Sequence, residues 1–487
     1  MKTFVFFCRE ELTNLYYLID AFLSQECTTL FLCYGEKEQN ALKSRGVNDD
    51  HIVVFKHALE EELKNKELNL KELQYIDSLF RLETNGRFTL NGSIQYDRGF
   101  SFLENEEALL LAQSYYRFWD KFLRAYNVAC VLHEMPSLLM NHMCAVVCKH
   151  LGIIYLHNII ISGEAKYSYL NIIGDDYSCP QLHKEYFVAQ KDPSRIDVLR
   201  CKKFISNFRE SYQILCSNIS VQPSLRRWLF KAIRERARTI ILKSKYDRLI
   251  DNIDYWLIHN KEAEETFWNL VSYRRHLNFD NPVFGEKYYF YPFHLEPEAT
   301  VLYSADGIYE NQVKLIQNIA ASLPVGYYLY VKDHPHYIGY RDLIDYLRLL
   351  NIPNVRLLHS FISGKSIIAS SVGVITINGT AGLEGLLLGK HVYTFGNAYY
   401  NIAERVHYVR NIRDLSRLLQ DTKDKVYVCD DDLYLFVHAY LKAQQFGMID
   451  YFGGRSSKLD VDERENARTI ASNILNFISD MSKHITD

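Results

Sequence analysis

The sequence predicts an α/β protein with two doubly wound domains, each a parallel sheet with helices on both faces. Short runs rich in Val, Ile, Tyr and Phe alternate with segments of helical period, and this alternation occurs once in each half of the chain. The 487 residues are 48% hydrophobic and 24% charged, which is enough apolar material for more than one core. We therefore expect two Rossmann-like domains joined by helical segments.

In the first half, apolar runs bounded by polar residues mark the strands, and longer amphipathic stretches mark the helices. The expected strands are 3–7, 28–33, 129–133 and 153–157, and the expected helices are 108–126 and 138–150. The same signals are clearer in the second half. There the expected strands are 287–293, 327–332, 355–358, 372–377 and 391–395, and the expected helices are 310–322, 340–350 and 381–388.

These elements lead to four predicted parts of the chain. They are a Rossmann-like domain at 1–215, a basic helical linker at 216–280, a second Rossmann-like domain at 281–450 and a C-terminal helical segment at 451–487. The last part contains an amphipathic helix from Asp462 onward.

Residues 225–248 carry nine basic and two acidic side chains, with large apolar residues between them. A basic amphipathic helix of this kind can lie on an anionic lipid surface. The alternative is a solvated linker helix with one apolar side against a domain. The sequence leaves both interpretations open.

Composition excludes several classes of protein. A formal net charge of −3 argues against a protein that coats nucleic acid, and ten cysteines without a Cys-x-x-Cys pair argue against zinc or thiol-redox sites of that type. The apolar run near the N-terminus is too short for a signal peptide, and no stretch of about 18 apolar residues could span a bilayer. We expect a cytoplasmic protein, with peripheral contact at the inner face of the membrane as an added option.

Polar and glycine-rich residues follow the strands of the second half, where ligands of open α/β sheets bind. Asn378, Gly379 and Thr380 open a helix whose free amides and dipole favour an anion, and Thr380 adds a hydroxyl. Gly379 and Gly382 would let phosphate oxygens approach the backbone. Taken alone, this segment would be interpreted as an ordinary turn and helix N-cap, and the neighbouring loops favour the anion site.

Three more loops are expected at the same edge, after the strands at 287–293, 327–332 and 391–395. His334, held by Pro335, can donate to a leaving phosphate, and Lys332 precedes it at the end of its strand. Glu384 could accept from sugar hydroxyls, although it could also be a surface carboxylate. The expected donor pocket is completed by three side chains that could equally form a polar turn: His294, Glu296 and Glu298, with Pro297 stiffening their loop.

In this order and spacing, the motifs resemble the bacterial capsule polysaccharide biosynthesis family that includes the β-Kdo transferases. The resemblance covers roughly residues 285–415 and depends on the motifs together. They are Tyr291-Pro292-Phe293-His294-Leu295-Glu296-Pro297-Glu298, Gln312 in a helix that ends before Pro324, Val331-Lys332-Asp333-His334-Pro335, Ile377-Asn378-Gly379-Thr380-Ala381-Gly382-Leu383-Glu384, Gly389-Lys390 and Phe395-Gly396.

The resemblance implies a GT-B glycosyltransferase that is independent of metal. Its active site would lie in a cleft between an acceptor domain, residues 1–215, and a nucleotide-sugar domain, residues 281–450. In the family, the His-Pro and Ser/Thr motifs bind a CMP-activated ulosonic acid such as Kdo, which implies this role for His334, Pro335 and Thr380. Asp333 replaces the commoner Glu, and His391 stands where Pro often occurs. Neither departure reaches the expected phosphate contacts.

The first half is assigned by position. Glu134 follows the strand at 129–133 and would activate the acceptor hydroxyl or stabilise an oxocarbenium-like centre, so that Glu134 and His334 are the expected catalytic residues. Asp97 and Arg98 are candidates for binding the acceptor. No metal site is expected, because the run from Asp430 to Asp432 is typical of a helix N-terminus.

The preferred interpretation is a transferase that moves an ulosonic acid (Kdo, sialic or pseudaminic-like) from a CMP donor to a surface glycan or lipid-linked acceptor. No cofactor is expected besides the CMP-activated sugar, which is a co-substrate, and nucleic acid is not an expected partner. One alternative is a GT-B enzyme that uses a UDP-sugar or a CDP-polyol. The other is a non-catalytic capsule assembly partner that keeps the fold.

Overall fold

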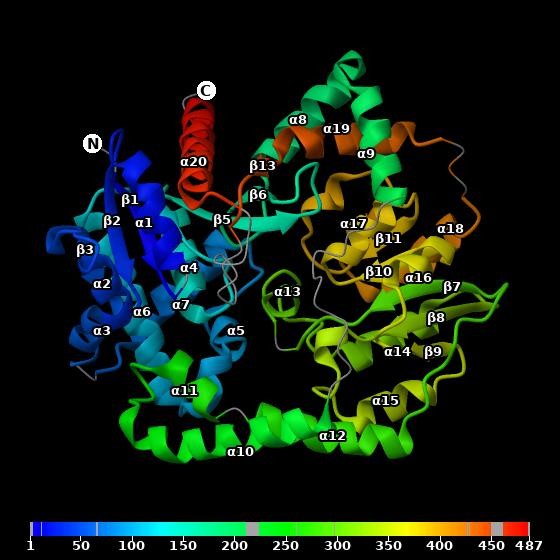
Figure 1. Cartoon of the computed structure of the whole chain (residues 1–487), viewed down its shortest axis with the longest axis horizontal. Coiled ribbons are helices and arrows are strands. Elements are labelled where there is room, and N and C mark those ends of the chain that lie inside the picture. Colours follow the sequence, from blue (N-terminus) through cyan, green and yellow to red (C-terminus); the bar gives the residue numbers. More distant parts are fainter. Residues whose placement is uncertain are drawn as a thin grey trace. The chain divides into compact units, whose positions relative to one another are not determined.

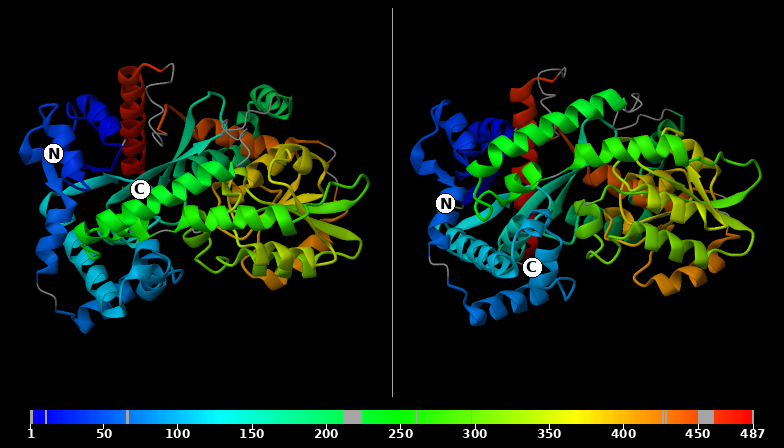
Figure 2. Two further views of the ribbon diagram at one scale, coloured as in Figure 1. Left: turned by 60° about the horizontal axis from the view of Figure 1, so that its bottom comes forward. Right: turned by 90° about the horizontal axis from the view of Figure 1, so that it is seen from below.

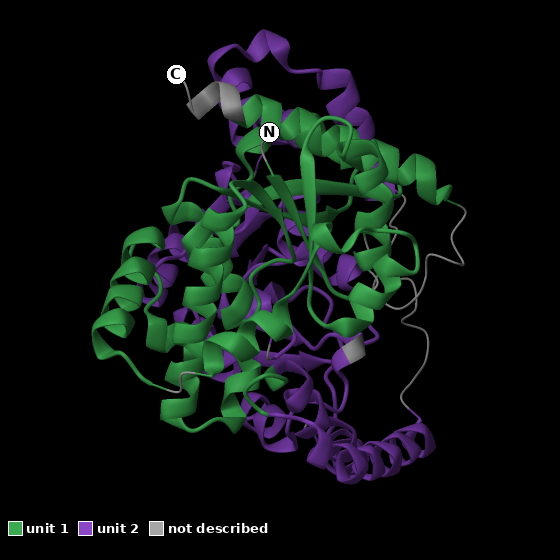
Figure 3. Ribbon diagram, turned by 90° about the vertical axis from the view of Figure 1, so that its left-hand side faces the viewer, with its two compact units in different colours: residues 1–182, 248–252, 441–487 green, residues 183–247, 253–440 purple. Residues whose placement is uncertain are grey.

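The computed structural model describes residues 3–10, 12–64, 67–210, 224–259, 261–296, 298–425, 427, 429–449 and 461–485. The chain forms two compact units (Figure 3). Unit 1 contains residues 1–182, 248–252 and 441–487, and unit 2 contains residues 183–247 and 253–440. The chain passes from the first unit to the second within helix α8 (Pro180–Lys191).

Unit 1 is built on a seven-stranded sheet of order β13-β6-β5-β4-β1-β2-β3. Its strands are β1 (Thr3–Cys8), β2 (Thr28–Cys33), β3 (Ile52–Val54), β4 (Val128–Leu132), β5 (Ile154–Ile161), β6 (Ser168–Ile173) and β13 (Gln445–Phe446). The first five strands run parallel, whereas β6 and β13 each pair antiparallel with their neighbours. A parallel Rossmann-like sheet thus ends in an antiparallel edge.

Helices cover both faces of this sheet because successive side chains of its strands point to opposite sides. Phe6 faces α1 and the C-terminal helix, whereas Phe7 packs on the other side against Phe55 and Trp119. The helices are α1 (Leu12–Leu23), α2 (Glu36–Lys43), α3 (Phe55–Leu63), α4 (Leu70–Glu83), α5 (Leu90–Gln95), α6 (Asn105–Ala125), α7 (Leu139–His150) and α20 (Glu463–Ile485).

Unit 2 contains a six-stranded sheet of order β12-β11-β10-β7-β8-β9, in which all pairs are parallel (Figure 1). Its strands are β7 (Lys287–Pro292), β8 (Tyr327–Lys332), β9 (Val355–Leu358), β10 (Gly373–Thr376), β11 (His391–Thr394) and β12 (Val406–Tyr408). The chain adds β8 and β9 on one side of β7 and then returns to add β10 on the other. This reversal is the switch point at which such sheets bind ligands.

Both faces of the second sheet are also covered. Tyr289 and Tyr291 lie in the larger core, and Tyr288 and Phe290 lie in the smaller core on the opposite face. The helices of unit 2 are α9 (Val198–Glu210), α10 (Leu225–Leu242), α11 (Asn252–His259), α12 (Glu262–His276), α13 (Ala299–Leu302), α14 (Gln312–Ser322), α15 (Leu343–Leu350), α16 (Gly364–Ser370), α17 (Thr380–Leu387), α18 (Leu415–Thr422) and α19 (Asp431–Ala443).

The predicted fold class is confirmed, with two doubly wound α/β units and a C-terminal helix, and each predicted strand and helix has an observed counterpart within a few residues. The division into units differs from the predicted boundaries. Residues 183–247 lie in the second unit, and α20 returns to the first unit because its apolar face packs beside α1. The predicted boundaries after residues 215 and 450 fall outside the described residues.

Membrane-spanning segments were searched for among the described residues. No helix there combines the length and the apolar character that crossing a bilayer requires.

Candidate functional site

The switch point of the second sheet lies between β7 and β10, and the loops that follow these strands contact each other. Nε2 of His294, after β7, lies 3.2 Å from Oγ1 of Thr376 and 3.4 Å from the amide nitrogen of Asn378, and it also contacts the Asn378 carbonyl oxygen. Burial lowers the pKa of His294, so its imidazole is held neutral. His294 therefore joins the two loops and fixes the backbone from which α17 begins.

The start of α17 is shaped by Gly379, the N-cap residue. Its φ of 109° lies in the region that favours glycine, and a Cβ there would lie 3.5 Å from Nε2 of His294. Gly379 has no side chain to cap the helix; the Asn378 side chain accepts from the Gly379 amide at 2.6 Å and donates to the Asn397 carbonyl at 2.9 Å. Among the described residues, the first turn of α17 thus presents backbone N–H groups without a capping side chain, as an anion site requires.

Gly382 has a packing role that the sequence interpretation did not foresee. A Cβ on Gly382 would lie 2.3 Å from the Tyr400 hydroxyl oxygen, and that hydroxyl donates to the Gly379 carbonyl at 2.7 Å. Because Gly382 has no side chain, there is room for the Tyr400 ring, whose hydroxyl holds the turn at Gly379. The expectation that Gly382 admits a phosphate oxygen is replaced by this contact.

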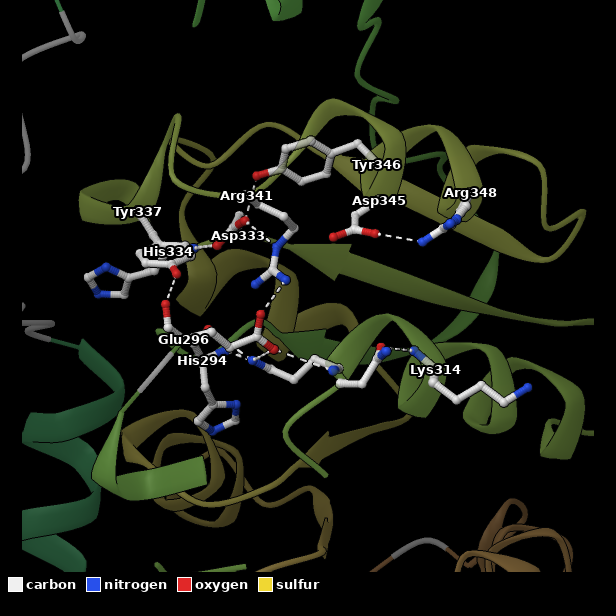
Figure 4. A network of polar contacts seen from close by, with 12 residues as sticks. His294, Glu296, Lys314, Asp333, His334, Tyr337, Arg341, Asp345, Tyr346 and Arg348 are labelled. Atoms are coloured by element: carbon white, nitrogen blue, oxygen red, sulfur yellow. Dashed lines mark hydrogen bonds and ion pairs between the residues drawn. The ribbon is translucent and has the colours of Figure 1, made fainter. Parts of the chain in front are cut away.

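A buried arginine organises the loops after β7 and β8 (Figure 4). Arg341 donates from Nη1 to Glu296 at 2.7 Å and from Nε to Asp333 at 3.2 Å, and its guanidinium lies 3.7 Å from the centre of the Phe293 ring. Tyr346 donates to the same Asp333 carboxylate at 2.5 Å. Two carboxylates from neighbouring loops are thus held by one cation that is 4% exposed.

Gln312, the first residue of α14, fixes the loop after β7 from the other side. Its side-chain oxygen accepts from the His294 amide at 2.9 Å, and its Nε2 donates to Oε1 of Glu296 at 2.6 Å. Burial raises the pKa of Glu296, whereas the charge of Arg341 opposes that rise. Glu296 therefore serves to hold the loop, and Pro297, which was expected to stiffen it, lies outside the described residues.

His334 stands at the end of β8 on a backbone that Asp333 fixes. Oδ1 of Asp333 accepts from the His334 amide at 2.7 Å, and Pro335 opens a single 3₁₀ turn, Pro335–Tyr337. In Figure 4 the rings of His294 and His334 are both directed away from the Arg341 guanidinium. The network thus positions His334 through its backbone amide, which donates to Asp333.

Lys332 is the last residue of β8, and its side chain is buried. It is 8% exposed, and Nζ donates to the Ser360 carbonyl at 2.9 Å. Burial lowers the pKa of Lys332 to about 8, and the charges of Asp333 and Glu384 oppose that shift. Lys332 and Glu384 are therefore close enough to interact, although they come from β8 and from α17.

The structure thus brings most of the predicted donor residues to one edge of one sheet. His294, Glu296, Asn378 and Gly379 form one connected group, and the exposed Thr380 begins α17 directly beside it. Since β7 lies between β8 and β10, the ends that carry His334 and Thr380 are about 10 Å apart. Glu298 lies just before α13 as its N-cap residue.

In unit 1 the corresponding switch point lies between β1 and β4, and Glu134 follows β4. Oε2 of Glu134 lies 3.3 Å from Nη1 of Arg9, which follows β1, and Tyr155 donates to the Glu134 carbonyl at 2.7 Å. Burial raises the pKa of Glu134, whereas Arg9 and Arg98 oppose that rise. The prediction that Glu134 stands at the tip of a buried strand is confirmed, and Arg98 lies within electrostatic reach of it.

Asp97 is committed to the backbone. Its two carboxylate oxygens accept from the Gly99 amide at 2.8 Å and from the Leu139 amide at 2.6 Å, and the side chain is buried. Burial raises the pKa of Asp97 to about 6, against these two hydrogen bonds. Asp97 thus caps the 3₁₀ turn Arg98–Phe102 and ties it to α7, while an acceptor role for Arg98 stays a prediction.

The acidic run before α19 binds arginines. Arg405 donates from Nε to Asp432 at 2.5 Å, and Arg209 donates to Asp430 at 2.8 Å. Over the described part of the chain, no group of three His, Cys, Asp or Glu side chains is arranged to hold a metal ion. Independence of metal stays a prediction about the reaction.

Three residues of these sites were missed or given no role by sequence reasoning: Arg341, Gln312 and Arg9. Gln312 stands in a motif to which the sequence assigns no role, and Arg9 follows the N-terminal apolar run without a pattern that marks it. Arg341 stands seven residues after His334, beyond a turn, and no local pattern marks it as the partner of Asp333 and Glu296. Pairing across loops of this kind follows from strand order rather than from spacing in the sequence.

Comparison with known proteins supports the resemblance in the second unit. Residues 244–444 match the family model described as "Capsule polysaccharide biosynthesis protein". The predicted resemblance to that family is therefore confirmed over the part of the chain that holds the second sheet and all the predicted donor residues.

Individual relatives are more distant. Protein FixF of Sinorhizobium fredii (strain NBRC 101917 / NGR234) is 29% identical over 150 residues, which is 30% of this chain and 34% of that protein, so the match spans about a third of the relative. A β-Kdo 2,7-transferase, KpsC of Thermosulfurimonas dismutans, is 12% identical over 73% of this chain and 89% of the other, with a TM-score of 0.34. A UDP-GlcNAc 2-epimerase of Neisseria meningitidis is 11% identical over 98% of this chain and 100% of the other, with a TM-score of 0.27.

Proposed function

We propose that this chain, whose second unit matches capsule polysaccharide biosynthesis proteins, is a glycosyltransferase that moves an ulosonic acid from a CMP donor to a bacterial surface glycan or lipid-linked acceptor. The observation that carries the proposal is the start of α17. Gly379 turns the chain at the switch point of the sheet and leaves the first amides of the helix without a side-chain cap. A helix that begins in this way at this place suits the phosphate of a nucleotide.

The proposed donor site assigns one task to each side chain. The phosphate accepts hydrogen bonds from the first amides of α17 and from the Thr380 hydroxyl, and His334 donates to the oxygen that leaves with CMP. Lys332 adds positive charge beneath the site, and Glu384 accepts from hydroxyls of the sugar. His294, Glu296, Pro335 and Asn378 hold the loops that carry these groups.

The reaction forms one bond and breaks one bond. The acceptor oxygen bonds to the anomeric carbon, and the bond from that carbon to the phosphate oxygen breaks, so that CMP leaves with the electron pair. Glu134 takes the proton of the acceptor hydroxyl, a task that its raised pKa favours. The proposal includes no cofactor and no metal, and a lipid-linked acceptor would place the reaction at the cytoplasmic face of a membrane.

Two measurements test the proposal. The first is the thermal unfolding of the whole chain with CMP, CDP or UDP, because a ligand that binds only the folded protein at about 100 times its Kd stabilises it by about 2.7 kcal/mol. We expect CMP to raise the melting temperature most. A larger rise with UDP would instead identify a UDP-sugar enzyme, and one with CDP a polyol-phosphate enzyme.

The second measurement is CMP release from a panel of CMP-activated ulosonic acids. We expect release with at least one donor, faster when a glycan acceptor is present. The Glu134→Gln protein should bind CMP as the wild type does, but it should form CMP from the donor slowly. Absence of release with every donor, from a protein that binds CMP, would favour the non-catalytic assembly partner.

A further inference from the structure

Helix α10 has one face that packs on its own unit. Trp228 meets the Tyr340 ring edge-on at 5.7 Å, Thr239 donates to the Ile258 carbonyl at 2.5 Å, and Lys231 lies 3.6 Å from Glu262. These contacts recur along the side of α10 that faces α12, and both helices belong to unit 2. The two helices are among the green segments of Figure 2, where colour follows the sequence. One side of α10 is therefore packed against other residues of unit 2.

The opposite face of α10 is apolar and exposed, which is the reverse of an ordinary surface helix. Five large apolar side chains on it are between 41% and 73% exposed. They are Leu229, Phe230, Ile233, Ile240 and Ile241. At about 100° per residue, these five positions cover about 120° of the helix surface, centred away from Trp228 and Thr239. Scattered exposed apolar residues need no explanation, but a continuous stripe marks an interaction surface.

Basic side chains border this stripe on both sides. Arg227, Arg234 and Arg238 follow one border, and Arg236 and Lys243 follow the other. Arg236 has an exposed ion pair with Glu264 at 3.7 Å, whereas within the described residues Arg227, Arg234, Arg238 and Lys243 pair with no carboxylate. Arg226 lies within the stripe near the start of α10, where its long side chain can reach outward past the apolar residues.

We propose that this face of α10 docks the protein on an anionic lipid bilayer, with the helix in the plane of the interface. An exposed apolar stripe between two rows of cations matches the chemistry of that interface, because the apolar side chains enter the acyl boundary while the cations meet the headgroup phosphates. A peptide partner would instead have to present acidic side chains on both sides of an apolar surface. The charge of the whole chain is −3, so the positive charge is local to this segment.

Docking does not depend on the chemistry at the second sheet, although it would hold a transferase beside a lipid-linked acceptor. Binding to vesicles therefore tests it without donor or acceptor. If docking fails while CMP release continues, the proposed function stands; if CMP release fails while docking holds, the membrane surface stands.

The experiment is flotation of the full chain with vesicles of phosphatidylcholine, either pure or containing phosphatidylglycerol. One variant removes the stripe (Phe230→Ser, Ile233→Ser, Ile241→Ser), and a second reverses one border (Arg227→Glu, Arg234→Glu, Arg238→Glu). A matched control changes another exposed helix, α9, at an apolar residue and two lysines (Leu199→Ser, Lys202→Glu, Lys203→Glu). All the altered side chains are exposed, so unfolding temperatures should match the wild type.

We expect the wild type and the α9 control to float with anionic vesicles and to be released by high salt, and both α10 variants to lose binding by at least about tenfold. Equal binding by the α10 variants and the wild type would overturn the proposal, as would a wild-type protein that ignores anionic vesicles. Light scattering completes the test. If the wild type is a dimer, the variant without the stripe is a monomer and neither binds lipid, the stripe joins two copies of the chain.

Discussion

The two sheets share a strand order around their switch points but place opposite chemistry there. In unit 1 the loops after β1 and β4 bring together Arg9 and Glu134, a carboxylate with a raised pKa beside a cation. In unit 2 the loops after β7 and β10 bring together His294 and Gly379, with an uncapped helix and a buried lysine close by. The same topology thus places a carboxylate with a raised pKa in one unit and a helix start without a side-chain cap in the other, and the proposed roles of proton acceptor and anion site depend on this difference.

Removal of the carboxylate is expected to have the largest effect. Glu134→Gln keeps the shape but cannot accept a proton, so the kcat of transfer should fall by about a thousandfold while CMP affinity stays within about twofold. Initial rates and calorimetric titration with CMP measure the two quantities. Normal turnover by this variant would remove the difference in role between the two switch points.

Arg9 offers a finer test of the same carboxylate. Arg9→Met removes a charge that lowers the pKa of Glu134, so that pKa should rise and the acid limb of the kcat/KM profile should move to higher pH. Arg9→Lys keeps the charge and should leave the limb near its wild-type position. A limb that does not move in Arg9→Met would mean that another group titrates there.

Among these variants, loss of the buried Arg341 is expected to have the largest effect on stability. Arg341→Met leaves the half-buried Glu296 and the buried Asp333 without their cation, which should lower the free energy of unfolding by about 3–5 kcal/mol. Arg348→Met removes the exposed ion pair with Asp345 within α15, and it should change the free energy of unfolding by less than about 1 kcal/mol. Urea unfolding of both variants gives the comparison, and equal losses would contradict a special role for Arg341.

A smaller effect is expected at the start of α17. Thr380→Val removes one hydroxyl donor and should weaken CMP binding by about tenfold, whereas Thr380→Ser should bind like the wild type. Because Thr380 is exposed, neither substitution should change the unfolding temperature much. Calorimetric titration with CMP measures both, and identical affinities for the Val and Ser proteins would exclude this hydroxyl from the site.

The smallest effect concerns pH. The pKa of Lys332 is lowered to about 8, below the usual value for lysine, so its positive charge is present below that pH and is lost above it. Donor affinity should therefore weaken as pH rises through about 8, and Lys332→Arg should remove this decline because arginine stays charged. A decline of the same size in the Arg protein would assign it to another group.

Sequence reasoning was most accurate where a single segment carries the signal. The strands at 28–33, 327–332 and 355–358 were predicted at their observed bounds, because buried parallel strands are short apolar runs between polar residues. The short strands β3 and β12 were missed because three residues carry too little periodicity. The antiparallel strand β6 was also missed, since its place depends on pairing with β5.

The candidate site divides in the same way. Gly379 and Thr380 could be predicted because a turn and a helix N-terminus are local features. The role of Arg341 could not, because its partners Asp333 and Glu296 are brought to it only when β7 and β8 pair side by side. The packing role of Gly382 could not be predicted from its own segment either. The Tyr400 hydroxyl, which occupies the place of a side chain at Gly382, comes from the loop after β11.

The proposed phosphate site at the second switch point is tested most directly by comparing CMP with cytidine. The two ligands differ by the phosphate, so their difference in affinity measures what the α17 amides, Thr380 and His334 contribute. By calorimetric titration, the wild type should bind CMP at least about a hundredfold more tightly than cytidine, and the Thr380→Val/His334→Gln protein should lose at least about tenfold of that difference. Equal affinity of the wild type for CMP and cytidine, or a difference that survives intact in the double variant, would contradict the account.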